Sequence, residues 1–196
     1  MTAVELLFKL WSPIYDRPIF QRTFYRRIHA RLLESLDGPA PSRVLDLGCG
    51  TAQLTNDLQR RWPAALVMGA DLSEGMLTAA QSRLGAAAPQ LVRANVYALP
   101  FADDSLDLVT SSISYHWYVE PRRALAQVHR VLRPGGRFAL ATISSLLTTR
   151  RLPRMRVATL DATRADLVAA GFAVISTQRM FPTLVPAVSI LVGEKR

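Results

Sequence analysis

Short apolar runs alternate with amphipathic segments along most of the chain, and this alternation predicts an ordered series of strands and helices. The apolar runs predict strands over residues 43–47, 65–70, 90–94, 105–111, 136–143, 172–180 and 187–193. The amphipathic segments predict helices over residues 52–61, 74–84, 121–132 and 161–170. Such an alternation favours a mostly parallel sheet covered by helices, which is an α/β fold.

The first 42 residues differ from this pattern. Residues 4–36 are amphipathic and are predicted to be helical, and Pro13 and Pro18 divide them into two pieces. Residues 37–42, rich in Gly, Pro and Ser, read as a linker into the first strand. We therefore expect a helical cap with its linker over residues 1–42 and a single domain over residues 43–196.

A glycine-rich turn follows the first predicted strand. The sequence Val44-Leu-Asp-Leu-Gly-Cys-Gly-Thr51 places Gly48 and Gly50 where a buried strand turns into a helix. The second predicted strand ends at Asp71, 21 residues beyond Gly50. A right-handed βαβ unit brings such an acid beside the glycine turn, where its carboxylate can accept hydrogen bonds from ribose hydroxyls. Together these features indicate a cofactor that contains adenosine.

The kind of cofactor follows from what the glycine turn lacks. A dinucleotide site has a third glycine that lets helix and strand pack around a pyrophosphate, and Gln53 stands at that position here. The phosphate-cradling sequence Gly-Lys-Ser/Thr does not occur in the chain. Asp46, two residues before Gly48, would repel a pyrophosphate but suits a ligand with an amino group and a sulfonium.

Residues 43–143 resemble a class I S-adenosylmethionine-dependent methyltransferase, in the small-molecule branch that includes the ubiquinone/menaquinone-biosynthesis C-methyltransferases (methyltransferase type 11). The resemblance covers about half of the chain. Its motifs, in order, are Val44–Thr51, Gly69–Ser73 with Met76, Ala94–Val96 with Leu99–Phe101, Ser105–His116 and Leu132–Gly136. It implies a Rossmann-like, doubly wound sheet of seven strands in the order 3-2-1-4-5-7-6, with the seventh strand antiparallel and an N-terminal helical cap. It also implies S-adenosyl-L-methionine as cofactor.

The resemblance also implies roles for individual residues. The glycine turn would face the methionyl part of the cofactor, Asp71 would hold the ribose, and Asn95 with Val96 would bracket the adenine. Relatives commonly have Asp at the position of Asn95; the amide oxygen can still accept the adenine amino group, or Asn95 merely shapes a turn. Tyr15 resembles a tyrosine that lies over the cofactor in a lid. The full set of candidate cofactor-binding residues is Tyr15, Asp46, Gly48, Cys49, Gly50, Asp71, Leu72, Met76, Asn95, Val96 and Ser111.

Methyl transfer from a sulfonium needs mainly positioning and exclusion of water, so an obligatory catalytic residue need not be visible in the sequence. The candidate general base is His116, just beyond the fourth strand, and the competing interpretation is a packing role beside Trp117. The other two histidines are expected outside the site: His29 exposed among arginines, and His129 on the flank of its helix. No metal ligands are assigned.

The net charge of +9 comes almost entirely from arginine, because Lys9 and Lys195 are the only lysines among 24 basic residues. The sets Arg22/26/27/31 and Arg130/133/137 predict solvated surfaces. The set Arg150/151/154/156 follows the fifth strand on the ligand side of the sheet, so it either contacts an anionic acceptor or membrane surface or is simply solvated. A single cysteine, no secretory signal and no long apolar run predict a cytoplasmic protein.

Three classes of function stay open at this point. The first is O- or C-methylation of a small, lipophilic or extended acceptor, or an anionic one, by a monomer or homodimer. The second is methylation of RNA or DNA, kept open by the basic charge, although the Asn/Asp-Pro-Pro-Tyr/Phe motif of amino-methylating enzymes is replaced by Ser-Ser-Ile-Ser at residues 111–114. The third is cofactor binding without catalysis.

Overall fold

A computed structural model describes residues 24–85, 89–145, 150–152, 155–180 and 187–196. The part of the predicted cap that precedes residue 24, including Tyr15, lies outside these residues. The cap is represented by one helix, α3 (Arg26–Glu34), whose buried face carries Ile28 and Leu32.

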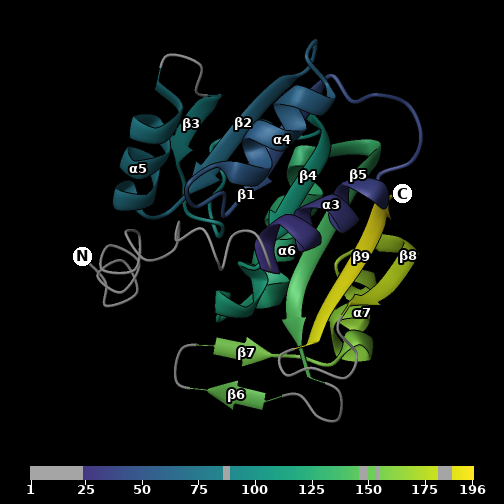
Figure 1. The fold of residues 1–196 in the computed structure, drawn as a ribbon. Coiled ribbons are helices and arrows are strands. Elements are labelled where there is room, and N and C mark those ends of the chain that lie inside the picture. The colour runs from purple at the N-terminus through teal and green to yellow at the C-terminus, as the bar shows by residue number, and fades with distance from the viewer. Residues whose placement is uncertain (1–23, 86–88, 146–149, 153–154, 181–186) are drawn as a thin grey trace.

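Seven strands form the main sheet, in the order β3-β2-β1-β4-β5-β9-β8 (Figure 1). The strands are β1 (Arg43–Leu47), β2 (Leu66–Asp71), β3 (Gln90–Arg93), β4 (Leu106–Ser112), β5 (Leu132–Ser144), β8 (Phe172–Met180) and β9 (Ala187–Lys195). The first five are parallel, and β9 is antiparallel to both β5 and β8. The predicted order and the antiparallel seventh strand are therefore confirmed.

Helices cover both faces of this sheet (Figure 1). The helices are α4 (Gln53–Arg61), α5 (Glu74–Leu84), α6 (Pro121–Val131) and α7 (Leu160–Ala169), with the short 3-10 helix η3 (Tyr115–Trp117). On one face α3 and α4 pack against the sheet through Ile28, Leu32 and Leu58. On the other face α6 and α7 pack against it through Leu125 and Leu167.

The basic segment after β5 is not a simple loop, in contrast to the expectation from the sequence. Its backbone forms a small two-stranded antiparallel sheet of β6 (Arg150–Leu152) and β7 (Met155–Val157). Figure 1 shows this hairpin beyond the end of β5, at the edge of the sheet where the parallel strands finish. In an α/β sheet this carboxyl edge is where ligands bind.

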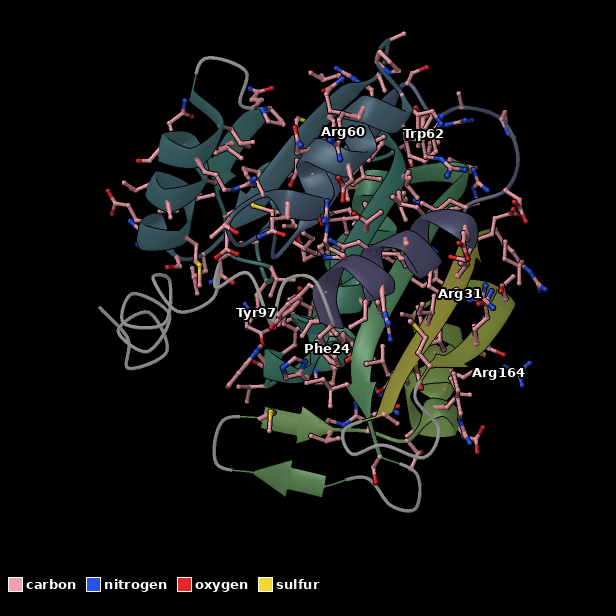
Figure 2. All side chains as sticks on the ribbon, in the orientation of Figure 1. Phe24, Arg31, Arg60, Trp62, Tyr97 and Arg164 are labelled. Carbon is pink, nitrogen blue, oxygen red and sulfur yellow. The ribbon has the colours of Figure 1, made fainter. Side chains whose placement is uncertain are left out.

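The arginines divide into solvated and structural groups. Figure 2 shows Arg31, Arg60 and Arg164 on the surfaces of α3, α4 and α7. Arg130 contradicts the prediction of a solvated surface, because its guanidinium donates to the carbonyl oxygens of Phe101 (2.8 Å) and Leu99 (2.9 Å). These hydrogen bonds tie α6 to the loop between β3 and β4.

No helix in the part of the chain that the structure describes is long and apolar enough to cross a membrane.

Candidate functional site

The glycine turn sits between β1 and α4, against the end of β2. The backbone N–H groups of Gly48 and Cys49 both donate to the carbonyl oxygen of Ala70, at 2.8 and 3.0 Å. Gly48, Gly50 and Ala52 all have positive φ, at 72°, 53° and 59°. A β-carbon on Gly48 would lie 2.5 Å from that of Ser114, so this position requires glycine for packing as well as for its backbone conformation.

Asp71 lies beside the glycine turn, as predicted. Its Oδ2 accepts a hydrogen bond from the Gly50 N–H (2.9 Å), and its Oδ1 accepts one from the Ser73 N–H (2.8 Å). Burial raises the pKa of this carboxyl, and the two backbone donors oppose the shift. Each carboxylate oxygen still has a lone pair for a further donor, so Asp71 fits the role of a ribose acceptor.

Asp46 is almost fully buried beneath the turn, at the wall of the cleft described below. Its side chain is 1% exposed and accepts hydrogen bonds from the hydroxyls of Thr55 (2.7 Å) and Thr110 (3.1 Å). Burial raises the pKa of Asp46 to about 6. Its negative charge therefore contributes to the potential at the turn while its oxygens hold α4 and β4 in place.

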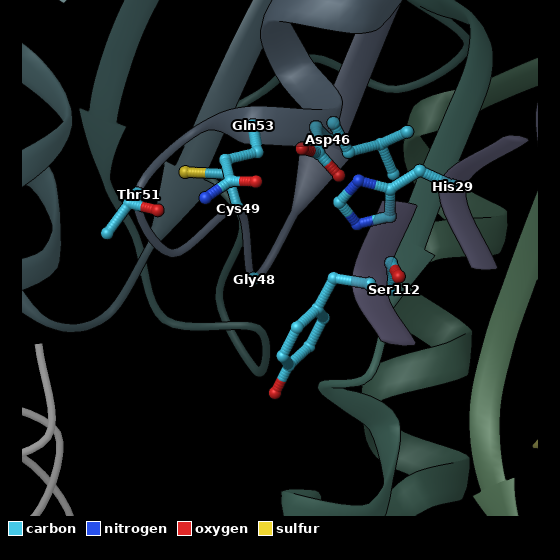
Figure 3. A pocket seen from close by; sticks show the side chains of 9 residues that line it. His29, Asp46, Gly48, Cys49, Thr51, Gln53 and Ser112 are labelled. Atoms are coloured by element: carbon cyan, nitrogen blue, oxygen red, sulfur yellow. The ribbon is translucent and has the colours of Figure 1, made fainter. Parts of the chain in front are cut away.

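A narrow cleft with a cavity volume of about 20 Å³ adjoins the glycine turn (Figure 3). Its lining residues are Tyr25, His29, Asp46, Gly48, Cys49, Thr51, Gln53, Leu54 and Ser112. Cys49 is among them with a thiol whose pKa burial raises, so it remains a protonated, small wall residue. The cleft therefore joins the glycine turn to the inner side of α3.

His29 is the residue that sequence reasoning missed. In contrast to the exposed position that the sequence predicts, it is only 7% exposed and its ring lies in the cleft near Asp46 (Figure 3). Its Nδ1 is 4.0 Å from Asp57 Oδ2 on α4, and burial lowers its pKa to about 4, so the ring is neutral at neutral pH. The missed signal was its position next to the apolar residues Ile28 and Leu32 on the same helix.

The serines after β4 have different environments. Ser111 is fully buried, and its hydroxyl forms a hydrogen bond with that of Ser114 at 2.7 Å. Ser114 also donates to the Leu47 carbonyl oxygen at 3.3 Å, next to the glycine turn. Of the two serines whose sequence position suggests a cofactor contact, Ser112 lines the cleft and Ser111 does not. Ser111 thus contacts the glycine turn only through Ser114.

The predicted adenine side is assembled at the ends of β2 and β3. The Ala94 N–H donates to the Asp71 carbonyl oxygen (3.0 Å), which brings the neighbouring Asn95 to the same edge. Asn95 is exposed, and its Oδ1 accepts from the Tyr97 N–H (3.0 Å), so it does shape a turn. Val96 is partly buried and Leu72 is 40% exposed, so both have surface available for a ligand.

Two of the predicted site residues, Met76 and His116, are almost fully buried. Met76 is only 3% exposed, under the start of α5. His116 in η3 is 3% exposed, with its ring 5.2 Å from that of Trp117, and burial lowers its pKa to about 4. It does not line the cleft at the glycine turn, and its role as a base stays a prediction.

Residues 45–140 match the model of a methyltransferase domain family. These residues form a methyltransferase domain of that family. S-adenosylmethionine is the family's cofactor, and the glycine turn with Asp71 is consistent with it.

Curated relatives carry two kinds of name. A malonyl-[acyl-carrier protein] O-methyltransferase of Methylococcus capsulatus is 43% identical over 106 residues, which are 54% of this chain and 38% of the relative. One of Geobacter sulfurreducens is 36% identical over 166 residues, 75% of this chain and 62% of the relative. A demethylmenaquinone methyltransferase of Thermus thermophilus is 38% identical over 103 residues, 52% of this chain and 47% of the relative. The chain thus spans about half the length of these relatives.

Solved structures share the fold at lower identity. An S-adenosylmethionine-dependent methyltransferase of Mesorhizobium loti superposes with a TM-score of 0.71 at 22% identity, covering 85% of this chain and 96% of that one. The [4+2]-cyclase SpnF superposes with a TM-score of 0.72 at 21% identity, covering 86% and 80%. Because a cyclase has this fold too, the fold alone does not determine the reaction.

Proposed function

We propose that this chain transfers a methyl group from S-adenosylmethionine to an oxygen or carbon of a small, extended acceptor. The observation that carries the proposal is the contact between Asp71 and Gly50, which joins a ribose-binding carboxylate to the glycine turn of a methyltransferase-family domain. A cytoplasmic location remains the expectation from the single cysteine.

The first acceptor class to test is the free carboxylate of a thioester-linked acyl chain. Among the relatives above, those named for malonyl-[acyl-carrier protein] suggest this class, and the one named for demethylmenaquinone suggests a quinol carbon as the alternative. The hairpin of β6 and β7 is too small to form a separate substrate domain, which favours an acceptor that extends beyond the protein.

The residues of this chain would bind and orient the two reactants and exclude water from them. Bound at the turn, S-adenosylmethionine supplies an electrophilic methyl group on a sulfonium. Asp71 would accept hydrogen bonds from the ribose hydroxyls, and the backbone of Gly48 and Gly50 would lie against the methionyl part. A carboxylate acceptor is already an anion at neutral pH, so it needs no general base. A carbon or hydroxyl acceptor must lose a proton, which is the step that would require a base such as His116.

The proposal is tested by measuring the release of S-adenosylhomocysteine. A malonyl thioester and a demethylated quinol serve as separate acceptors. Asp71→Ala should lose turnover with either acceptor through weaker cofactor binding. His116→Ala should keep most of the turnover with the malonyl thioester and lose about 10²–10⁴-fold with the quinol if it acts as the base. No turnover with either acceptor, in a chain that binds the cofactor, would contradict the proposed acceptor classes.

Two of the arginines give the nucleic-acid alternative no support. Arg130 and Arg156 are occupied by carbonyl and carboxylate partners within the protein. A continuous exposed basic surface is what a phosphate backbone requires.

A further inference from the structure

A second hollow lies beside the start of α6, separate from the cleft at the glycine turn. Its volume is about 530 Å³, and it shares no lining residue with that cleft. Its walls come from the start of α6, from β7 and from α7: Val119–Arg123, Arg156 and Asp166. Because α6 follows the loop at the end of β4, this arginine groove opens near the carboxyl edge of the sheet, where an acceptor must arrive.

One side of the arginine groove is fixed by an internal ion pair. Arg156 Nη1 lies 2.6 Å from Asp166 Oδ2, and the two side chains are only 13% and 10% exposed. The Tyr115 hydroxyl donates to the same carboxylate oxygen at 3.2 Å. This pair is therefore a rigid wall that also ties β7 to the loop carrying His116.

The other side carries cations that are not neutralised to the same extent. Arg122 is 78% exposed and its Nε lies 3.9 Å from Asp166 Oδ1, a carboxylate already engaged by Arg156. Arg123 is 60% exposed, lies 3.4 Å from Glu120 Oε1, and stacks its guanidinium 5.3 Å from the centre of the Tyr97 ring. The arginine groove thus has three guanidinium groups against two carboxylates.

A further anion beside these two arginines would be favourable. Arg122 and Arg123 stand in the first turn of α6, which contains no acidic residue, at the positive end of the helix dipole. Pro121, the first residue of α6, has no N–H, and the Ala124 N–H donates to the Glu120 carbonyl oxygen, so the backbone donors at this end are the N–H groups of Arg122 and Arg123. An oxyanion in the arginine groove would meet these donors and both guanidinium forks at once. Val119, 71% exposed, offers an apolar contact beside them.

We propose that the arginine groove binds a phosphate ester on the part of the acceptor that is not methylated, with Arg122 and Arg123 as its ligands. The inference rests on the proposed function, because it assumes an extended acceptor that reaches the cofactor cleft with its other end. Phosphate is the group that guanidinium forks and helix N–H donors recognise together. Arg156 and Asp166 act as positioning residues that hold the wall against which the ester lies.

Binding measured without methyl transfer tests this inference independently of the reaction. The probes are 4′-phosphopantetheine and pantetheine, titrated by calorimetry into the full chain in the presence of S-adenosylhomocysteine. We expect the phosphorylated probe to bind at least about 10-fold more tightly, and the difference to shrink at high salt, because exposed charges are screened. The double variant Arg122→Gln/Arg123→Gln should bind both probes equally.

Arg164→Gln is the matched control, since it removes one exposed arginine from the surface of α7 outside the arginine groove. It should retain the preference for the phosphorylated probe. Equal affinity of the wild-type chain for the two probes would overturn the inference, and so would an equal loss in Arg164→Gln. Arginine-dependent binding to phosphatidic acid vesicles, with no binding of 4′-phosphopantetheine, would also overturn it, because the phosphate would then belong to a membrane.

The two proposals fail in different ways. If both malonyl thioesters, with and without the phosphate, are methylated with the same KM, the proposed function stands and the arginine groove is not a phosphate site. If the phosphorylated probe binds through Arg122 and Arg123 but no thioester is methylated, the phosphate site stands and the proposed acceptor is wrong.

Discussion

Replacement of Asp71 by Asn tests the link between the site geometry and the cofactor. The aspartate uses one oxygen for the Gly50 N–H and the other for the Ser73 N–H. The amide has nearly the same size but only one acceptor oxygen, so one of the two backbone donors must face an NH₂ group. The substitution also removes the negative charge that would accept from the ribose hydroxyls.

The expected magnitudes follow from these two losses. A hydrogen bond to a charged group is worth about 1.5–3 kcal/mol, so the loss of one ribose contact weakens cofactor binding by about 10- to 150-fold. An unpaired backbone N–H costs about 1–3 kcal/mol of folding free energy. Equilibrium dialysis with labelled S-adenosylmethionine measures the first effect, and urea denaturation without ligand measures the second.

Asp107 provides a control with the same kind of structural contact. Its Oδ2 accepts hydrogen bonds from the backbone N–H groups of Ser42 (2.7 Å) and Arg43 (2.8 Å), at the start of β1 and the opposite edge of the sheet. Arg133 donates to the other oxygen, Oδ1, so in Asp107→Asn the single amide oxygen can serve either the two backbone N–H groups or Arg133. Asp107→Asn should therefore lose stability, like Asp71→Asn, and leave cofactor affinity unchanged. If both variants lose the same affinity, Asp71 acts only through the fold, and its assignment to the ribose is refuted.

Three further predictions concern stability and the shape of the site. Gly48→Ala should abolish cofactor binding, because its new β-carbon meets Ser114. Gly85→Ala, also at positive φ but with open space around it, should cost only the backbone strain of about 1–3 kcal/mol in urea denaturation. Burial lowers the pKa of His29 and His116 to about 4, so the folded chain binds fewer protons than the unfolded chain between pH 4 and 6.5. The stabilisation that comes from burying these neutral rings is present above pH 6.5 and is lost as the pH falls to 4. His29→Gln and His116→Gln should therefore lose less folding free energy than wild type between pH 7 and 4.5. An equal loss would contradict the assignment of buried neutral rings. Asp166→Ala should destabilise by about 3–5 kcal/mol because it strands the Arg156 guanidinium, and the double variant Asp166→Leu/Arg156→Met should recover most of this in the same assay.

Much of the fold could be predicted because its determinants are local. The alternation of apolar runs and amphipathic segments identifies the strands and helices, and the resemblance to a family supplies their order. The nearness of Asp71 to Gly50 also follows from the sequence, since a right-handed crossover brings the ends of adjacent parallel strands together.

The rest depends on contacts between distant segments. A histidine among arginines resembles a solvated surface, and only the packing of α3 on the sheet shows that the side of His29 is covered. The internal positions of Arg130 and Arg156 escape sequence reasoning for the same reason, since their partners Phe101 and Asp166 belong to other elements of the fold. Only Ser112 of the two neighbouring serines lines the cleft, because successive strand residues point to opposite faces of the sheet.

Calorimetric titration of the unmodified chain with S-adenosylhomocysteine tests whether the glycine turn and Asp71 form a site for this cofactor. We expect saturable heat that fits one binding site per chain, and no heat of binding with nicotinamide or flavin nucleotides. An absence of heat with both S-adenosylhomocysteine and S-adenosylmethionine, alongside tight binding of a nicotinamide or flavin compound, would contradict it.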